Sequence, residues 1–230
     1  MKNLKTKRKL LYWVLAVFAG IALLASGILF YFLSDPWGFA RDVEPAEEAA
    51  RLALIASAQQ WLGANEADGS HEEIIDLYNS HEPLAQDYTV QYTDSWCAVF
   101  VSAAAIASQE TNIIPTECGC QRQIELFAQM GCWQEDDNYL PLPGDIIYYS
   151  WGKQPLFSDC TGWSNHVGIV VGTAGPFIKV IEGNKNDRVA YRYILRGYYQ
   201  IRGYGLPDYG STKHRKRLPS EAFLRKLRLN

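Results

Sequence analysis

A cysteine lies at the point where a short polar stretch gives way to an apolar segment. Residues 94–102 read DSWCAVFVS, and the Ala-rich run that continues to Ser108 predicts a helix that begins near Trp96. The first backbone N–H groups and the dipole of such a helix stabilise a thiolate. Asp94 or Ser95 is the expected N-cap. Cys97 is therefore a candidate nucleophile, and a cysteine that only packs in a helical core is the alternative.

Two further side chains could complete a nucleophilic site. His166 opens the apolar segment 166–171 after a polar loop, and a strand end is a rigid mount for a general base. Glu182 closes the apolar segment 177–182, where a carboxylate is costly to desolvate without a partner, so it could orient an imidazole. Taken singly, each residue could be an exposed strand end. Together, their order after Cys97 is the layout of papain-like cysteine hydrolases.

Four segments in the same order carry a more specific resemblance. Residues 95–101 (SWCAVFV), 143–147 (PGDII), 166–170 (HVGIV) and 180–184 (VIEGN) resemble the CHAP family, cysteine, histidine-dependent amidohydrolases and peptidases related to the NlpC-type cell-wall hydrolases. The resemblance covers about residues 45–208. It implies a papain-like fold with Cys97 as nucleophile, His166 as general base, Glu182 orienting the imidazole and Asn184 supporting it.

The resemblance leaves some positions open. Many relatives carry Asp directly before the catalytic His, where this chain has Asn165. The oxyanion hole would combine the Cys97 backbone N–H with an upstream side chain, and Gln91 and Tyr92 are both candidates. The turn Pro143-Gly144-Asp145 is interpreted as structural.

Aromatic residues near these segments could form a substrate groove. The candidates are Trp96, Trp151 and Trp163, the last two in the loop 150–165, and aromatic side chains suit a sugar–peptide polymer. Packing within the loop is the alternative. Cys118 and Cys120 either border this groove, pair with other cysteines or pack. No metal or other cofactor is predicted, because the cysteine spacing fits no zinc pattern and no HExxH motif occurs.

The elements that must position these residues follow an α+β pattern. Helices are predicted first and short strands rich in Val, Ile and Tyr after them, which indicates helices packed on an antiparallel sheet. The expected helices cover 44–64, 71–79, 96–108 and 121–130, and the expected strands cover 145–151, 167–171, 177–182, 189–195 and 201–204.

The N-terminal part predicts a membrane anchor. Residues 1–9 are basic, and residues 10–33 form a run of 24 residues without a charge, which is long enough to cross a bilayer. The positive-inside rule puts the N-terminus in the cytoplasm. A linker (34–44), a catalytic domain (45–210) and a basic tail (211–230) would then lie outside the cell. A cleaved signal peptide is the alternative, and it would release the domain as a secreted protein.

Charge is unevenly distributed along the chain. Residues 41–210 hold 10 basic and 23 acidic side chains, which argues against a nucleic-acid partner. The basic tail could contact anionic lipid or wall polymers, or be a disordered solubilising segment.

The sequence thus predicts a membrane-anchored peptidoglycan hydrolase that acts through a thioester. It does not separate an N-acetylmuramoyl-L-alanine amidase from a peptidoglycan endopeptidase. A non-catalytic wall-binding module and a papain-type protease that acts on proteins are the other hypotheses.

Overall fold

A computed structural model describes residues 2–33, 37–152 and 160–210. The chain divides into two compact units, Met1–Trp37 and Gly38–Asn230, which are described separately. The predicted basic tail 211–230 lies outside the described residues, as do residues 34–36 of the predicted linker and 153–159 of the predicted groove loop.

The first unit contains one long helix, α1 (Lys2–Leu33). Its side chains are described from Tyr12 to Gly27, and these are exposed. A search of the described residues found no helix with the length and hydrophobicity needed to cross a membrane. The predicted anchor 10–33 extends at both ends beyond the described side chains, and it stays a prediction.

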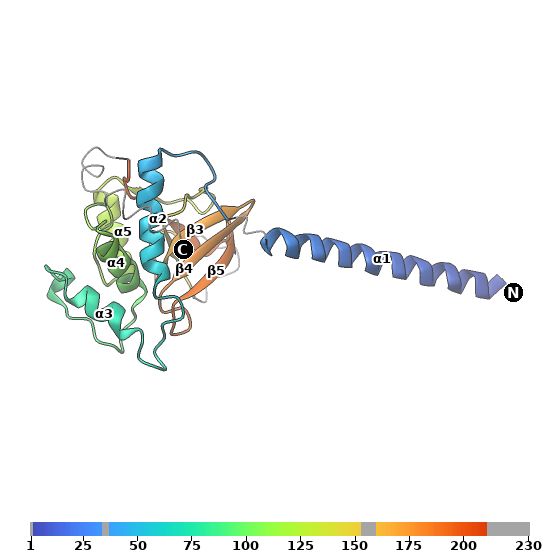
Figure 1. Ribbon diagram of the computed structural model, residues 1–230, viewed down its shortest axis with the longest axis horizontal. Coiled ribbons are helices and arrows are strands. Elements are labelled where there is room, and N and C mark those ends of the chain that lie inside the picture. Colours follow the sequence, from blue (N-terminus) through green and yellow to red (C-terminus); the bar gives the residue numbers. More distant parts are fainter. Residues whose placement is uncertain (1, 34–36, 153–159, 211–230) are drawn as a thin grey trace. The chain divides into compact units, whose positions relative to one another are not determined.

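The second unit is α+β, and its described helices all precede its described strands in the sequence (Figure 1). The helix α2 begins with Pro45 at its first position, directly after Glu44, a favourable place for proline because its missing N–H is not needed there. The helices are α2 (Pro45–Gln59), α3 (Glu72–Asn79), the 3₁₀ turn η1 (Ala85–Asp87), α4 (Cys97–Ser108) and α5 (Cys120–Gln129).

The described sheet has six strands, and each pair of adjacent strands is antiparallel. The order is β1-β6-β2-β3-β4-β5, so the last strand in the chain lies between the first two. The strands are β1 (Trp133–Gln134), β2 (Ile146–Tyr149), β3 (His166–Ala174), β4 (Phe177–Glu182), β5 (Ala190–Leu195) and β6 (Ile201–Gly205). The predicted α+β class and the order of helices and strands are confirmed; the two-residue β1 was not predicted.

Helices cover one face of the sheet, and α4 lies at the centre of that layer. Its apolar residues pack on β3 and β4. The helices α2, α3 and α5 adjoin it (Figure 1). Strand alternation sends Val167, Ile169 and Ile181 into this core. The opposite face has its own apolar cluster, which includes Tyr149 and Val180.

Candidate active site

Cys97 is the first residue of α4 and is only 6% exposed. The N-cap is Trp96, which makes no side-chain capping bond, so the predicted capping by Asp94 or Ser95 is wrong. The Asp94 carboxylate is engaged elsewhere and accepts a hydrogen bond from the Gln91 backbone N–H at 2.8 Å. The first turn of α4 is therefore not capped by the Trp96 side chain, and its Ala98 N–H contacts the Cys97 sulfur.

The end of β4 packs directly on the first turn of α4. A Cβ added at Gly183 would lie 2.6 Å from Phe100 Cγ and 2.9 Å from Trp96 Cζ3, so only glycine permits this approach. The carboxylate of Glu182, one residue earlier, is thereby held beside the helix that carries Cys97.

His166 and Glu182 form a buried pair at neighbouring strand ends. His166 Nε2 lies 3.1 Å from Glu182 Oε2, and the two residues are 8% and 0% exposed. Since Nε2 faces the carboxylate, Nδ1 is the ring nitrogen left for the Cys97 thiol. The structure thus brings together the three side chains that the sequence predicted as nucleophile, base and orienting acid.

The charges of the three groups depend on one another. The Cys120 thiol, the His166 imidazolium and the Ala98 backbone N–H hold the pKa of Cys97 well below its ordinary value, against the opposing effect of burial. Burial lowers the pKa of His166, but Cys97 and Glu182 outweigh it and raise this pKa to about 9. At neutral pH the arrangement favours a thiolate beside an imidazolium, the reactive form of a cysteine nucleophile.

Arg192 on β5 completes the site, and the sequence interpretation missed it. Its Nε donates to Glu182 Oε1 at 2.6 Å, and its guanidinium lies 4.5 Å from the centre of the Trp151 ring. Burial raises the pKa of Glu182, but His166 and Arg192 outweigh burial and lower it. Arg192 pairs with Val180 in the sheet, which makes it a diagonal neighbour of Glu182. The signal in the sequence was a positively charged residue, Arg192, between Tyr191 and Tyr193 in a predicted strand.

Gly168 leaves the space that the Glu182 side chain occupies. A Cβ at this position would lie 2.7 Å from Glu182 Cγ and 2.6 Å from Val180 Cγ1. The glycine of the segment HVGIV therefore has a direct role in the placement of the carboxylate.

Cys120 opens α5 and lies against the nucleophile. The two sulfur atoms of Cys97 and Cys120 are 3.5 Å apart, and Cys120 is 9% exposed. No disulfide joins any of the five cysteines, all of which lie in the described ranges. Of the alternatives left open for Cys120, the structure shows packing against Cys97. The same helix-start argument that singled out Cys97 could have found Cys120.

The three predicted groove tryptophans have different surroundings. Trp96 is fully buried and donates through Nε1 to Glu66 Oε1 at 2.9 Å, so its assignment to a surface groove is wrong: the ring is part of the core. Trp163 is 59% exposed. Trp151 is partly buried and stacks on Tyr149, with ring centres 4.8 Å apart.

Asn165 fastens the backbone of Trp151. Its Oδ1 accepts the Trp151 N–H at 2.7 Å, and its Nδ2 donates to the Trp151 carbonyl. A carboxylate could accept the first bond but could not donate the second. These two hydrogen bonds are a physical reason for Asn at position 165, where the resemblance implies Asp.

The remaining predicted site residues hold local positions. The Gln91 amide donates to the Thr89 carbonyl at 2.8 Å, and the Tyr92 hydroxyl donates to Asp76 at 2.7 Å. Both donors are therefore engaged away from Cys97, and an oxyanion role for either stays a prediction. Asn184 has a φ of 52° directly after Gly183, where it turns the chain. Its support of Glu182 also stays a prediction.

Asp145 is a second buried carboxylate and has a structural setting. Its Oδ1 accepts from Arg51 Nη1 at 2.8 Å, and its Oδ2 accepts from the Leu142 backbone N–H at 2.8 Å. This pair ties α2 to the turn before β2, as the interpretation of that turn predicted.

Comparison of the chain with family models, curated protein sequences and solved structures found no significant match. Within the described ranges, no group of three His, Cys, Asp or Glu side chains is arranged to hold a metal ion.

Proposed function

We propose that the chain is a cysteine amidohydrolase or peptidase of the CHAP type, with a papain-like fold, that cleaves an amide bond in peptidoglycan. The observation that carries this proposal is the meeting of three side chains: the Cys97 thiol at the first position of α4, the His166 imidazole hydrogen-bonded to it, and the Glu182 carboxylate 3.1 Å from that imidazole. Cysteine hydrolases need this combination of thiolate, proton donor and orienting carboxylate.

The proposed reaction has two halves. The Cys97 sulfur attacks the amide carbon, and the oxyanion forms near the backbone N–H groups of the first turn of α4. The His166 imidazolium donates its proton to the leaving amine, which yields a thioester. Neutral His166 then takes a proton from water, which hydrolyses the thioester and regenerates the thiolate. Glu182 and Arg192 keep the imidazole oriented throughout.

The substrate is proposed from the family resemblance of four segments in the same order. A membrane anchor at residues 10–33 would hold the domain outside the cell, beside the wall polymer. An amidase and an endopeptidase differ in the bond that they cut but require the same catalytic groups.

The direct test is digestion of purified peptidoglycan by the full chain in detergent micelles, followed by mass spectrometry of the released fragments. We expect new amino groups from an amidase or endopeptidase cut, and none with Cys97→Ser. Cys132→Ser is the matched control, because Cys132 is a half-buried free thiol outside the site. Wall that stays intact, together with cleavage of a protein substrate, would refute the proposed substrate. Undiminished cleavage by Cys97→Ser would refute the mechanism.

A further inference from the structure

Two thiols, each at the start of a helix, face each other in the site. Cys97 begins α4 and Cys120 begins α5, and their sulfur atoms are 3.5 Å apart. A disulfide bond is about 2.0 Å long, so the atoms are in contact but not bonded. The proposed hydrolysis has no use for a second thiol at this position. Its placement against the nucleophile therefore calls for another role.

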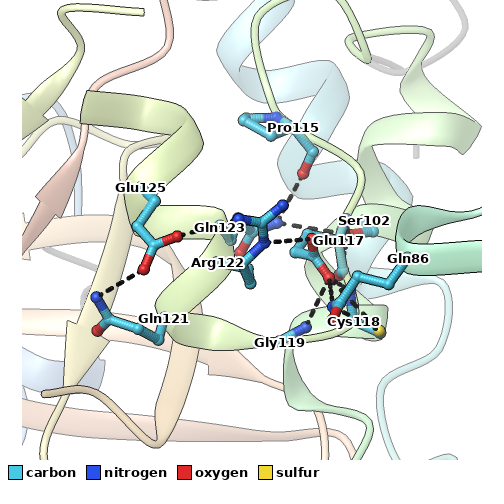
Figure 2. A network of polar contacts seen from close by, with 10 residues as sticks. All are labelled: Gln86, Ser102, Pro115, Glu117, Cys118, Gly119, Gln121, Arg122, Gln123 and Glu125. Atoms are coloured by element: carbon cyan, nitrogen blue, oxygen red, sulfur yellow. Dashed lines mark hydrogen bonds and ion pairs between the residues drawn. The ribbon is translucent and has the colours of Figure 1, made fainter. Parts of the chain in front are cut away.

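A network of polar contacts fixes the segment before Cys120 to α4 (Figure 2). The Ser102 hydroxyl on α4 donates to the Glu117 carbonyl at 2.8 Å and accepts from the Glu117 N–H at 2.9 Å. The buried Glu117 carboxylate in turn accepts from the N–H groups of Cys118 and Gly119, at 2.8 and 3.2 Å. The Gly119 N–H is one residue from Cys120, so the network determines where that thiol lies.

The first turns of α5 are tied to the same helix and to the sheet. The Gln123 amide donates to the Pro115 carbonyl at 2.8 Å and to Ser102 Oγ at 3.4 Å, as Figure 2 shows. The Tyr148 hydroxyl on β2 donates to Gln123 Oε1 at 2.8 Å. With α4, α5 and β2 joined in this way, the two sulfur atoms are held in contact by buried bonds on both sides.

The two thiols differ in protonation. Whereas the pKa of Cys97 is lowered, the neighbouring Cys97 and then burial raise the pKa of Cys120 well above its ordinary value. One thiolate and one thiol in contact are the partners of a two-step oxidation: the thiolate reacts with the oxidant, and the thiol resolves the product.

We propose that Cys97 and Cys120 form a reversible disulfide, which makes Cys120 the resolving thiol of a peroxide-sensitive site. The oxidant is a small peroxide, which suits side chains with only 6% and 9% exposure. This inference rests on the proposed function only in taking Cys97 as a reactive thiolate.

The chemistry balances in two steps. The Cys97 thiolate attacks one oxygen of hydrogen peroxide; an S–O bond forms, the O–O bond breaks, and hydroxide leaves with the electron pair. The Cys120 sulfur then attacks the Cys97 sulfur; the S–S bond forms, the S–O bond breaks, and the thiol proton leaves with the hydroxyl group as water. The sulfur pair loses two electrons and peroxide gains two. A dithiol reverses the change by thiol–disulfide exchange.

Cys120 also protects the nucleophile in this scheme. A sulfenic acid that meets no second thiol is oxidised further to sulfinic and sulfonic acids, which a dithiol does not reduce. The disulfide stops this series of oxidations at a state that a dithiol can reverse. In that state the site is inactive, because the Cys97 sulfur is bonded to Cys120.

The test uses the full chain in detergent micelles, treated with hydrogen peroxide and then with an alkylating agent. Peptide mass mapping should find Cys97 linked to Cys120 in the wild type, and dithiothreitol should remove the link. In Cys120→Ser and Cys120→Ala, Cys97 should instead be recovered as sulfinic or sulfonic acid, which dithiothreitol leaves unchanged. Cys118→Ser is the matched control, since it removes a half-buried thiol two residues away, and it should still form the link.

The readout is a map of modified sulfur atoms, so it is independent of wall cleavage. A 97–120 link in a protein that leaves peptidoglycan intact would refute the proposed substrate and support the disulfide. A wild type in which Cys97 is oxidised to sulfinic acid as fast as in Cys120→Ser, without the link, would overturn the disulfide proposal whatever the enzyme cleaves.

Discussion

The second unit contains two buried carboxylate–arginine pairs with nearly equal geometry. Glu182 accepts from Arg192 at 2.6 Å and Asp145 accepts from Arg51 at 2.8 Å, and the two carboxylates are 0% and 1% exposed. They differ in the partner of the second oxygen. On Glu182 it is the ring of His166, and on Asp145 it is a backbone N–H.

The second partner decides what each acid can do. The pKa of Asp145 is raised, because burial outweighs Arg51, whereas the pKa of Glu182 is lowered, because His166 and Arg192 outweigh burial. A backbone N–H cannot change its charge, so the Asp145 pair can only fasten a turn. An imidazole can gain or lose a proton, so the charge state of the Glu182 pair can change with pH. Burial and an arginine partner alone do not mark a functional acid.

The largest expected effect comes from neutralising the two acids. Glu182→Gln should lower kcat/KM for wall cleavage by about 10³-fold, because the imidazolium loses its stabilising charge and its orientation. Asp145→Asn should lower the free energy of unfolding and leave the activity of each folded molecule within about threefold, since it acts only on stability. Initial rates per folded molecule and urea unfolding separate the two. Equal losses of activity in Glu182→Gln and Asp145→Asn would contradict the proposed difference between the two acids.

The second prediction concerns the thiol. His166→Ala should raise the pKa of Cys97 part of the way to its ordinary value, because the neighbouring cation is gone while the Cys120 thiol, the larger cause of the lowering, remains. The alkylation rate of Cys97 at pH 6 should then fall by about 10²-fold. The measurement is the pH dependence of iodoacetamide labelling, read at Cys97 by peptide mass. Asp145→Asn is the control and should keep the wild-type rate. An unchanged rate in His166→Ala would remove the imidazole from the activation of Cys97.

The third prediction removes the cations. Arg192→Met and Arg51→Met each leave a buried carboxylate without its arginine, and each should cost about 3 kcal/mol of unfolding free energy. Arg192→Met should also change the pKa of His166, because Glu182 then has the imidazole as its remaining partner in the pair. Urea unfolding measures the first effect and histidine NMR titration the second. A His166 titration altered by Arg51→Met but not by Arg192→Met would contradict the assignment of Arg192 to the site.

The smallest effect is a shift of a pH profile. Activity should be present above the lowered pKa of Cys97 and should be lost as pH rises through about 9, where His166 loses its proton. Glu182→Gln should move this alkaline limb to lower pH, and Asp145→Asn should leave it in place. The measurement is kcat/KM against pH for the residual activity.

The same shift predicts the pH dependence of stability. Because the folded-state pKa of His166 lies above its ordinary 6.5, its contribution is complete below pH 6.5 and is lost as pH rises through about 9. On the acid side, Glu182 contributes stability above its ordinary pKa of 4.5 that is lost as pH falls through the lowered folded value. The raised pKa of Asp145 has the opposite effect: its contribution to the free energy of unfolding falls as pH rises. Unfolding curves over this range, with Glu182→Gln as reference, check both limbs.

The sequence predicted most elements of the second unit, because several of them have a regular hydrophobic period and several of their ends carry Pro or Gly, whereas α4 was recognisable from its apolar, Ala-rich composition. It could not predict β1, whose two residues contain no period, or the position of β6 between β1 and β2, which depends on pairing over long distances. Trp96 was misplaced because its contact with Glu66 joins segments 30 residues apart.

The candidate site was predictable where local sequence carries the signal. Cys97, His166 and Glu182 each lie at an element end, and their types indicate their chemistry. Arg192 was missed, and the contact of Cys120 with Cys97 was not predicted, because both depend on which neighbours meet in space: a diagonal position across two strands and a contact between two helix starts. Such neighbours follow from the register of the sheet and the packing of the helices, which one sequence does not display.

The position of β6 links reactivity to the completion of synthesis. Tyr149, whose ring lies 6.0 Å from that of His166, pairs across the sheet with Ile201, the first residue of the final strand. A ribosome must therefore release nearly the whole domain before the centre of the sheet can close around the imidazole. Until then the thiol at residue 97 has the weak nucleophilicity of any unfolded cysteine.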